Sequence, residues 1–183
     1  MKRLLHQTGS RSGKSPRFYS DQELLAESRI EAFRGSGPGG QKRNKTSNSI
    51  RATHLPTGMH VVAGESRSQA ENKMRAIRRL RLKLTVEIRE SIDPAHFEPP
   101  DWFLSIRHNN RIEASHHHDY YAAAAGLLLD LLKAMHGSPA DVAAMLGLPT
   151  TAVIRFLEDE PQLWTAANGI RGDLSLPPLT HRR

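Results

Sequence analysis

The chain contains 183 residues, of which 38% are apolar, and carries a formal net charge of +7 at pH 7. This length suits one ordinary domain or two small ones, and no apolar run reaches the roughly 18 to 20 residues that a membrane-spanning helix requires. The sequence contains no cysteine, which excludes disulfides, thiol nucleophiles and thiolate metal sites. We therefore expect a soluble protein, with the cytoplasm as its default compartment.

The charge is unevenly distributed along the chain. Residues 1–90 contain 19 Lys and Arg against 8 Asp and Glu, whereas residues 91–183 contain 7 against 11. Each Lys or Arg that neutralises a phosphate releases condensed counterions and adds affinity that does not depend on sequence. The basic half is therefore predicted to contact a polyanion, and the acidic half to face away from it.

Residues 1–19 contain five Lys or Arg, no acid, and the helix-disfavouring Gly9, Gly13 and Pro16. This composition predicts a flexible basic arm. Two alternatives are an arm that becomes ordered on RNA and a cleaved organelle presequence. The glycines argue against the presequence, because they interrupt a continuous amphipathic helix.

A first folded domain is predicted over residues 20–91. Ser20, with Glu23 three residues later, is typical of a helix N-cap. A weak alternation of apolar and polar residues over 28–34 then indicates a strand that leads into a glycine-rich loop. The residues after the loop, 41–48, are predicted to form a polar turn or a short helix.

Two strand-like segments, residues 50–55 and 59–64, flank Pro56-Thr57-Gly58, which has the residue types of a tight hairpin turn. From Ser66 onward the hydrophobic period changes to three and four residues. This spacing predicts that one side of a long helix is buried, formed by Ala70, Met74, Ile77, Leu80, Leu84 and Ile88. The first domain is therefore predicted to be β-α-β-β-α, with the helix laid across a small sheet.

The other sides of this long helix are strongly basic. A solvated helix usually balances its bases with acids four residues away, and here only Glu71, Glu87 and Glu90 do so. We therefore favour a helix that faces RNA over an ordinary solvated surface. The basic residues are Arg67, Lys73, Arg75, Arg78, Arg79, Arg81, Lys83 and Arg89.

A Pro-rich linker is predicted over residues 92–101, followed by a helical domain over 102–183. Residues 102–106 form a short segment with aromatic side chains, which is interpreted as a strand or a docking segment. The run His116-His117-His118-Asp119 suggests a metal site. However, three consecutive histidines cannot all point at one ion from a regular element, so we expect no metal there.

Residues 121–136 are predicted to form an apolar helix, and Ser138-Pro139-Ala140-Asp141 to start the next one. Ala143, Gly147 and Val153 then have the spacing of a helix-turn-helix. The second helix, residues 150–160, offers one cation against three acids, which disfavours contact with a phosphate-lined groove. We expect this geometry to serve packing, or a protein or RNA partner, instead of DNA reading. The whole chain is assigned to the α+β class.

The glycine-rich loop, residues 34–46, contains four glycines and a proline within six residues. Gly35-x-Gly37-x-x-Gly40 formally fits the dinucleotide-binding fingerprint. However, the residues that follow are polar and lead to a hairpin instead of a long amphipathic helix, and Pro38 removes an N–H from any phosphate cradle. A P-loop is excluded because Gln41 stands where a glycine must precede the lysine. We therefore expect no cofactor.

The segment Gly37-Pro38-Gly39-Gly40-Gln41-x-x-Asn44-Lys45-Thr46 resembles the GGQ motif of class I peptide chain release factors and of their shortened relatives that rescue stalled ribosomes. The resemblance continues through Arg51-x-Thr53-His54-x-Pro56-Thr57-Gly58 and Arg67-Ser68-Gln69-Ala70-Glu71-Asn72-Lys73. It spans about residues 28–90. Beyond residue 100 the chain resembles only the helical extensions of release-factor-like bacterial proteins.

This resemblance implies a peptidyl-tRNA hydrolase that acts at the P-site tRNA in the large ribosomal subunit. The catalytic residues would be Gly39, Gly40 and Gln41, with water as the nucleophile and the Gln41 backbone N–H stabilising the developing oxyanion. The loop and the long helix would bind ribosomal RNA through Lys42, Arg43, Asn44, Lys45, Arg67, Lys73, Arg75, Arg78 and Arg79.

Two departures from the family shape the predicted function. Ser15-Pro16-Arg17-Phe18 is not a codon-reading motif in a suitable setting, so we expect release or rescue without codon recognition. Residues 171–183 carry only three arginines, so sensing through a basic tail is not expected. The helical domain is expected to recognise a ribosomal state, a free large subunit or a protein partner. The alternative function is a non-catalytic ribosome- or RNA-binding factor, or a helix-turn-helix nucleic-acid regulator.

Overall fold

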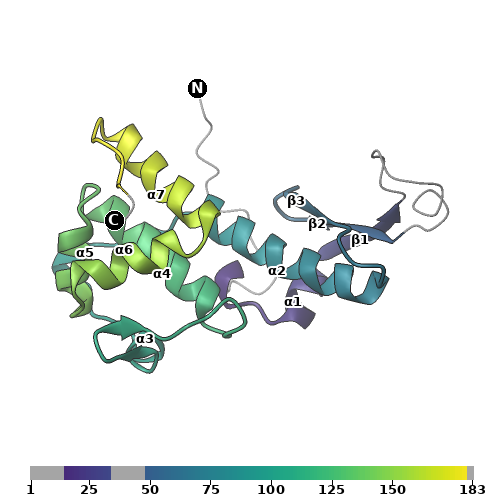
Figure 1. The fold of residues 1–183 in the computed structure, drawn as a ribbon, viewed down its shortest axis with the longest axis horizontal. Helices are drawn as coiled ribbons and strands as arrows, with labels where there is room; N and C mark the ends of the chain where they lie inside the picture. The colour runs from purple at the N-terminus through teal and green to yellow at the C-terminus, as the bar shows by residue number, and fades with distance from the viewer. Residues whose placement is uncertain (1–14, 34–47, 181–183) are drawn as a thin grey trace. The chain divides into compact units, whose positions relative to one another are not determined.

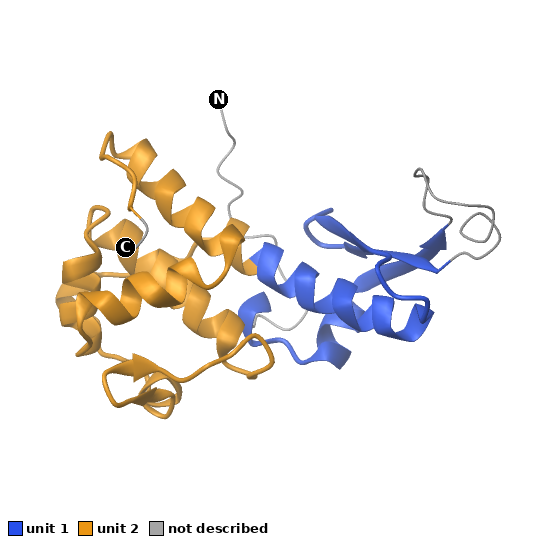
Figure 2. Ribbon diagram, in the orientation of Figure 1, with its two compact units in different colours: residues 1–84 blue, residues 85–183 orange. Residues whose placement is uncertain are grey.

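The computed structural model describes residues 15–33 and 48–180 (Figure 1). The chain divides into two compact units, residues 1–84 and 85–183 (Figure 2). The described ranges contain seven α-helices, a three-stranded antiparallel sheet and a two-stranded antiparallel sheet. The predicted α+β class is therefore confirmed.

The first unit contains a short leading helix, three strands and a long helix. The Ser20 hydroxyl accepts a hydrogen bond from the Glu23 N–H at 3.2 Å, and the Glu23 carboxylate accepts one from the Ser20 N–H at 2.6 Å. This capping box confirms the predicted helix start. The elements are η1 (Pro16–Phe18), α1 (Asp21–Ala26), β1 (Ser28–Phe33), β2 (Ser49–His54), β3 (His60–Ala63) and α2 (Gln69–Glu87).

The three strands form a sheet in the order β1-β2-β3, and both neighbouring pairs are antiparallel. The predicted hairpin is confirmed between β2 and β3, where Gly58 adopts a φ of 71° that favours glycine. The turn closes with a hydrogen bond of 2.8 Å from the His54 N–H to the Met59 carbonyl. The predicted turn or short helix at 41–48 lies almost entirely outside the described residues.

The long helix α2 buries a side that differs in part from the predicted one. Ile77, Leu80 and Leu84 are buried as expected, but Ala70 and Met74 are exposed. The buried positions instead begin at Asn72 and continue through Ala76 in steps of four. The prediction failed at the helix start because it assigned the interior to apolar residues only, whereas an asparagine is buried there for its hydrogen bonds.

The second unit is mostly helical and contains one small strand pair. Its elements are η2 (Pro94–His96), α3 (Asp101–Leu104), β4 (Arg107–His108), β5 (Arg111–Ile112), α4 (Tyr121–Ala134), α5 (Pro139–Leu146), α6 (Thr150–Glu158) and α7 (Pro161–Asp173). In α4, all twelve residues from 121 to 132 are buried, so this helix forms the centre of the unit.

Two details of this unit correct the sequence interpretation. The expectation of an all-helical domain was wrong, because β4 and β5 pair across Asn109 and Asn110. Both asparagines have positive φ, at 49° and 58°, which matches a tight hairpin turn. The strand interpretation of residues 102–106 was also wrong, because residues 101–104 form α3 and Phe103 is fully buried.

Helices α5 and α6 are related by a bend of 111°, within the range of about 90 to 120° that is typical of a helix-turn-helix. Ser138 caps α5 by accepting a hydrogen bond from the Asp141 N–H at 3.3 Å, as predicted. Gly147 ends α5 in the left-handed conformation, with a φ of 62°. Within the described ranges, no single helix is long and apolar enough to cross a membrane, and only the bent pair α5 and α6 passes that test together.

We predict that Gly147→Ala lowers the free energy of unfolding by about 1 to 2 kcal/mol, because a β-carbon strains the left-handed conformation. That carbon would also lie 2.6 Å from the Arg107 guanidinium. Gly169→Ala is the matched control within α7, where an added β-carbon meets nothing within 4 Å. It should stabilise the protein by about 0.5 to 1 kcal/mol. Urea unfolding measures both, and a neutral Gly147→Ala would contradict this role.

Candidate functional site

The predicted catalytic residues and the basic residues that follow them all lie between β1 and β2. Gly39, Gly40, Gln41 and residues 42–45 fall within 34–47 and are therefore outside the described residues. The structure does describe the residues at both ends of this segment, Phe33 and Asn48, together with the sheet and helix beside them. These surroundings show how the two ends of the loop are held.

The two ends of the loop are neighbours in the sheet. Phe33 is the last residue of β1 and pairs in the antiparallel ladder with Ser49, the first residue of β2. The guanidinium of Arg51 lies over the Phe33 ring at 5.2 Å from its centroid, which is within cation–π range. Residues 34–47 therefore begin and end on adjacent, paired strands.

The second end of the loop is also held by a buried side chain, that of Asn72 in α2. Its amide nitrogen donates to the backbone carbonyl of Asn48 at 2.7 Å and to that of Ser66 at 2.8 Å. Its amide oxygen accepts from the Ser66 N–H at 3.0 Å. Asn72 is fully buried, so these bonds have no competition from solvent. One side chain thus joins the loop end, the segment after β3 and the long helix.

The basic residues predicted along the long helix differ in their contacts, and Arg67 precedes Gln69, the first residue of α2. Arg67, Lys73 and Arg78 are exposed, and none has an ion pair or a side-chain hydrogen bond with any described residue. Arg75 is exposed and lies 3.9 Å from Glu71, at the limit of an ion pair. Arg79 is different, because its guanidinium pairs with Glu65 at 2.7 Å and donates to the Val62 carbonyl at 2.9 Å.

A second buried polar group lies under the β2–β3 turn, at His54. Its Nε2 is 3.3 Å from the Glu27 carboxylate, and its Nδ1 is 2.9 Å from the Thr57 hydroxyl. The hydroxyl of Tyr19 donates to the same carboxylate at 3.2 Å. Burial lowers the pKa of His54 by more than Glu27 raises it. The imidazole is therefore neutral at pH 7 and donates a hydrogen bond from Nε2 to Glu27, while Nδ1 accepts from Thr57.

Sequence reasoning did not assign a role to Asn72 or to His54. Both belong to the segments that carry the family resemblance, but a pattern of residue types does not show which polar groups are buried. The only local signal was the position of Asn72, one turn of helix before the buried Ala76 and two before Leu80. This spacing places a polar residue on the apolar side of α2, where a buried amide must be hydrogen-bonded.

Comparison with known proteins finds a family match for this part of the chain. Residues 24–99 match the family model described as the RF-1 domain. These residues are therefore similar to the RF-1 domain of peptide chain release factors. The RF-1 domain match begins at Leu24 in α1 and extends past the end of α2, so it contains both ends of the loop, the Asn72 contacts and His54.

The curated relatives of this RF-1 domain are named peptide chain release factor 1. The chain is 48% identical to the one from Parafrankia sp. over 67 residues, covering 37% of this chain and 19% of the relative. It is 46% identical to that of Caulobacter vibrioides over 70 residues, covering 38% and 19%, and 52% identical to that of Acetivibrio thermocellus over 62 residues, covering 34% and 17%. The chain thus spans about a fifth of the length of these relatives.

We predict that Asn72→Asp lowers the free energy of unfolding by about 2 to 4 kcal/mol, because the carbonyls of Asn48 and Ser66 lose their donor and a carboxylate is buried in place of the amide. Asn110→Asp, at an exposed turn position, is the matched control and should be nearly neutral. Urea unfolding followed by circular dichroism provides both values. A loss below about 0.5 kcal/mol for Asn72→Asp would show that these bonds do not hold the loop base.

The lowered pKa of His54 predicts a dependence of stability on pH. Below the ordinary histidine pKa of 6.5, the unfolded chain binds more protons at this position than the folded chain. The free energy of unfolding is therefore highest above pH 6.5 and decreases as the pH is lowered from there. Because His54 binds one proton, its contribution to the free energy of unfolding changes by at most about 1.4 kcal/mol per pH unit.

Unfolding free energies at pH 7.5 and pH 5.5 should therefore differ more in the wild type than in His54→Gln. The control is His60→Gln, on the exposed side of β3, which should keep the wild-type difference. An unchanged pH dependence in His54→Gln would contradict a buried, neutral His54.

Proposed function

We propose that this chain releases nascent peptides from stalled ribosomes by hydrolysing the ester of peptidyl-tRNA in the large subunit, without reading a codon. The observation that carries the proposal is the RF-1 domain match over residues 24–99, which contains Gly39-Gly40-Gln41. The hydrogen-bonded base of the loop supports it, since catalysis by positioning requires a loop that starts and ends on a rigid scaffold.

In this proposal water attacks the ester carbonyl, and the protein supplies position and oxyanion stabilisation. Gly39 and Gly40 permit the backbone conformation that directs the Gln41 N–H at the developing negative charge. The Gln41 side chain shapes the pocket that admits water. One well-placed donor of this kind contributes roughly 3 to 4 kcal/mol to the stability of the transition state.

The proposed RNA-binding surface combines the loop with the outward side of α2. Lys42, Arg43, Asn44 and Lys45 would hold the loop against ribosomal RNA. Arg67, Lys73 and Arg78 are exposed cations without partners among the residues that the structure describes, which leaves their charge available for phosphates. Arg75 and Arg79 would add positive charge to the same surface, although Arg79 already pairs with Glu65.

Two features of the described residues bear on codon recognition. The segment Ser15 to Phe18 contains η1, and Arg17 within it is only 5% exposed. A buried arginine cannot read an mRNA base, which supports the proposal that this segment does not recognise codons.

The second feature is the acidic helical unit beyond the RF-1 domain. We assign to it, over residues 102–183, the recognition of a ribosomal state or of a protein partner.

The alternative of a helix-turn-helix regulator is favoured by one observation, the 111° bend between α5 and α6. The composition of α6 opposes it. Val153, Phe156 and Leu157 are buried, and Arg155 is the one cation of the helix, which is followed by the acids Asp159 and Glu160. Sequence-specific DNA binding by the full chain that survives high salt would revive this alternative.

The proposal predicts that Gly40→Ala abolishes peptide release while ribosome binding persists, because the β-carbon prevents the loop conformation that directs the Gln41 N–H. Gln41→Ala should be milder, since the backbone donor remains. Gly172→Ala, at an open position in α7, is the control and should release peptide normally.

The measurement is release of labelled peptide from complexes with empty, sense-codon and stop-codon A sites, and from free large subunits. Equal release with sense and stop codons supports codon independence, whereas release restricted to stop codons would contradict it. A fully active Gly40→Ala protein would overturn the hydrolase proposal.

A further inference from the structure

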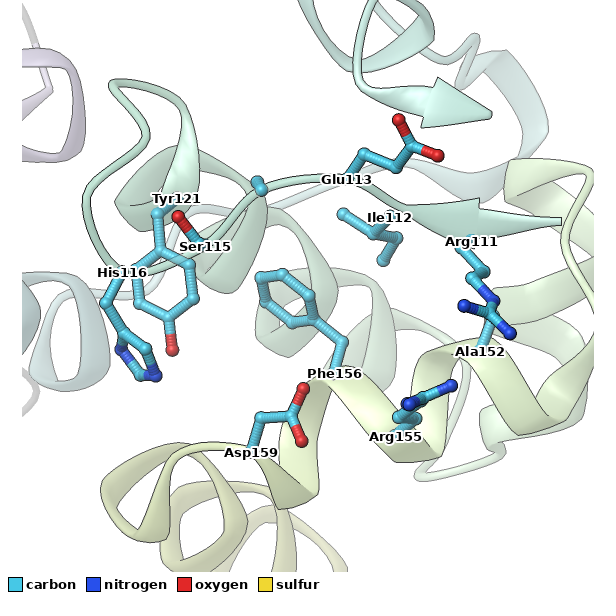
Figure 3. A pocket seen from close by; sticks show the side chains of 11 residues that line it. Arg111, Ile112, Glu113, Ser115, His116, Tyr121, Ala152, Arg155, Phe156 and Asp159 are labelled. Atoms are coloured by element: carbon cyan, nitrogen blue, oxygen red, sulfur yellow. The ribbon is translucent and has the colours of Figure 1, made fainter. Parts of the chain in front are cut away.

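The second unit contains a pocket of about 560 Å³ that the proposed hydrolysis does not use (Figure 3). Its walls come from β5 and the segment after it, from the start of α4, and from α6. The volume lies within the range of about 300 to 1,000 Å³ that is typical of small-molecule sites. All of its lining residues lie within residues 111–159, inside one compact unit.

One end of the pocket carries two arginines. Figure 3 shows the side chains of Arg111, from β5, and Arg155, from α6, at the same end of the cavity. Both residues are exposed, and neither guanidinium has a hydrogen bond or an ion pair with any described residue. Two unpaired guanidinium groups at one end of a cavity form a strong receptor for an anion, above all for a phosphate.

These two arginines stand out among the cations of the acidic second unit, because most of the others bind protein groups. Arg89 pairs with the buried Asp130 at 3.2 Å. Arg107 donates to the Leu146 carbonyl at 2.8 Å. Arg171 donates to the backbone carbonyls of Gly137 and Pro177. Within the described part of this unit, the cations without a side-chain partner are Arg111, Lys133 and Arg155, and two of these three line the pocket.

Aromatic rings form the wall next to the arginines. The centroids of Tyr121 and Phe156 are 5.4 Å apart, and those of His116 and Tyr121 are 4.5 Å apart. Tyr121 is only 7% exposed, and its hydroxyl has no hydrogen-bond partner among the described residues. Buried hydroxyls are nearly always paired, so this unpaired group in the pocket wall points to a ligand.

Two acids line the pocket, Asp159 and Glu113. Figure 3 shows Asp159 beside Phe156, between Arg155 and the rings of Tyr121 and His116. Outside the lining, Glu160 lies 3.7 Å from the His116 imidazole. Burial, followed by the charges of Glu160 and Asp159, raises the pKa of Tyr121, so its hydroxyl stays protonated. The pocket thus combines two cations, aromatic rings and the carboxylates of Asp159 and Glu113.

We propose that this pocket binds one nucleotide of a single-stranded RNA, with the phosphate between Arg111 and Arg155 and the base against the ring wall. Unstacked RNA bases bind in this way to Tyr, Phe and His rings, and the N–H groups of a base suit the carboxylate of Asp159. An acidic peptide would satisfy the arginines, but it has no planar base to place against the aromatic rings. The site lies wholly in the second unit and does not depend on the proposed hydrolysis.

The test titrates the ¹⁵N-labelled full chain with adenosine monophosphate and follows backbone resonances by NMR. The shifts should concentrate at residues 111–121 and 152–159. Arg111→Gln and Arg155→Gln should each weaken binding about tenfold or more, because each removes a charge-assisted contact. Lys133→Gln, which removes an unpaired cation outside the pocket, should bind like the wild type. Shifts confined to residues 67–83, or unchanged affinity in both arginine variants, would overturn the proposal.

Three competing ligands define the class of the occupant. Ribose 5-phosphate should bind at least tenfold more weakly than adenosine monophosphate, and equal binding would overturn the role of the ring wall. The RNA hexamer A6 should displace adenosine monophosphate from the same residues, whereas failure to do so would overturn an RNA occupant. A hexaglutamate peptide should not compete, and displacement by it would overturn the proposal in favour of an acidic protein segment.

Discussion

The base of the proposed catalytic loop depends on the amide of Asn72. This side chain donates to the carbonyls of Asn48 and Ser66 and accepts from the Ser66 N–H, all within 3.0 Å. Only a primary amide provides both donors and the acceptor from one position, and full burial excludes water as a replacement for any of them. The pairing of Phe33 with Ser49 holds the two strand ends together at the base of the loop. The proposed chemistry needs a loop with well-placed ends, and these contacts provide them.

The long helix α2 combines structural cations with cations that are free for a partner. Arg79 and Lys83 donate to the carbonyls of Val62 and His60 and so attach the helix to β3. Arg78, within the helix, and Arg67, two residues before it begins, have no partner among the described residues. This division explains how a strongly basic helix contributes to a stable fold. Its apolar side is buried, and some of its cations are bound to protein carbonyls. The remaining charge is available to a polyanion.

The second unit uses most of its few cations to stabilise its own fold. Arg89 neutralises the buried Asp130, and Arg107 satisfies the carbonyl of Leu146 at the end of α5. Two of the three exceptions, Arg111 and Arg155, line the same pocket and therefore indicate a ligand there. The helix-turn-helix geometry of α5 and α6 is a packing solution here, since α6 buries Phe156 and Leu157 and ends next to acidic residues. In our proposals, this unit contacts RNA through a pocket and not through a recognition helix.

The sequence by itself determined the features that depend on local chemistry. The Ser20 capping box, the β2–β3 turn with Gly58 and the Ser138 cap follow from neighbouring residues, so their patterns were sufficient. The glycine-rich segment with Gly39-Gly40-Gln41 also carried the resemblance to release factors, and it lies within the RF-1 domain match over residues 24–99. The strand pair at Asn109 and Asn110 was missed because each strand has only two residues, too few to form a hydrophobic pattern.

Only the tertiary structure decided which polar groups became buried. Asn72 and His54 have contacts from residues 24 and 27 positions away in sequence, and a local pattern contains no information about such partners. The pocket is a further case, because Arg111 and Arg155 are brought to one cavity by the packing of β5 against α6. The sequence thus determined the chemistry of the loop, while long-range packing decided what holds it and where a second ligand can bind.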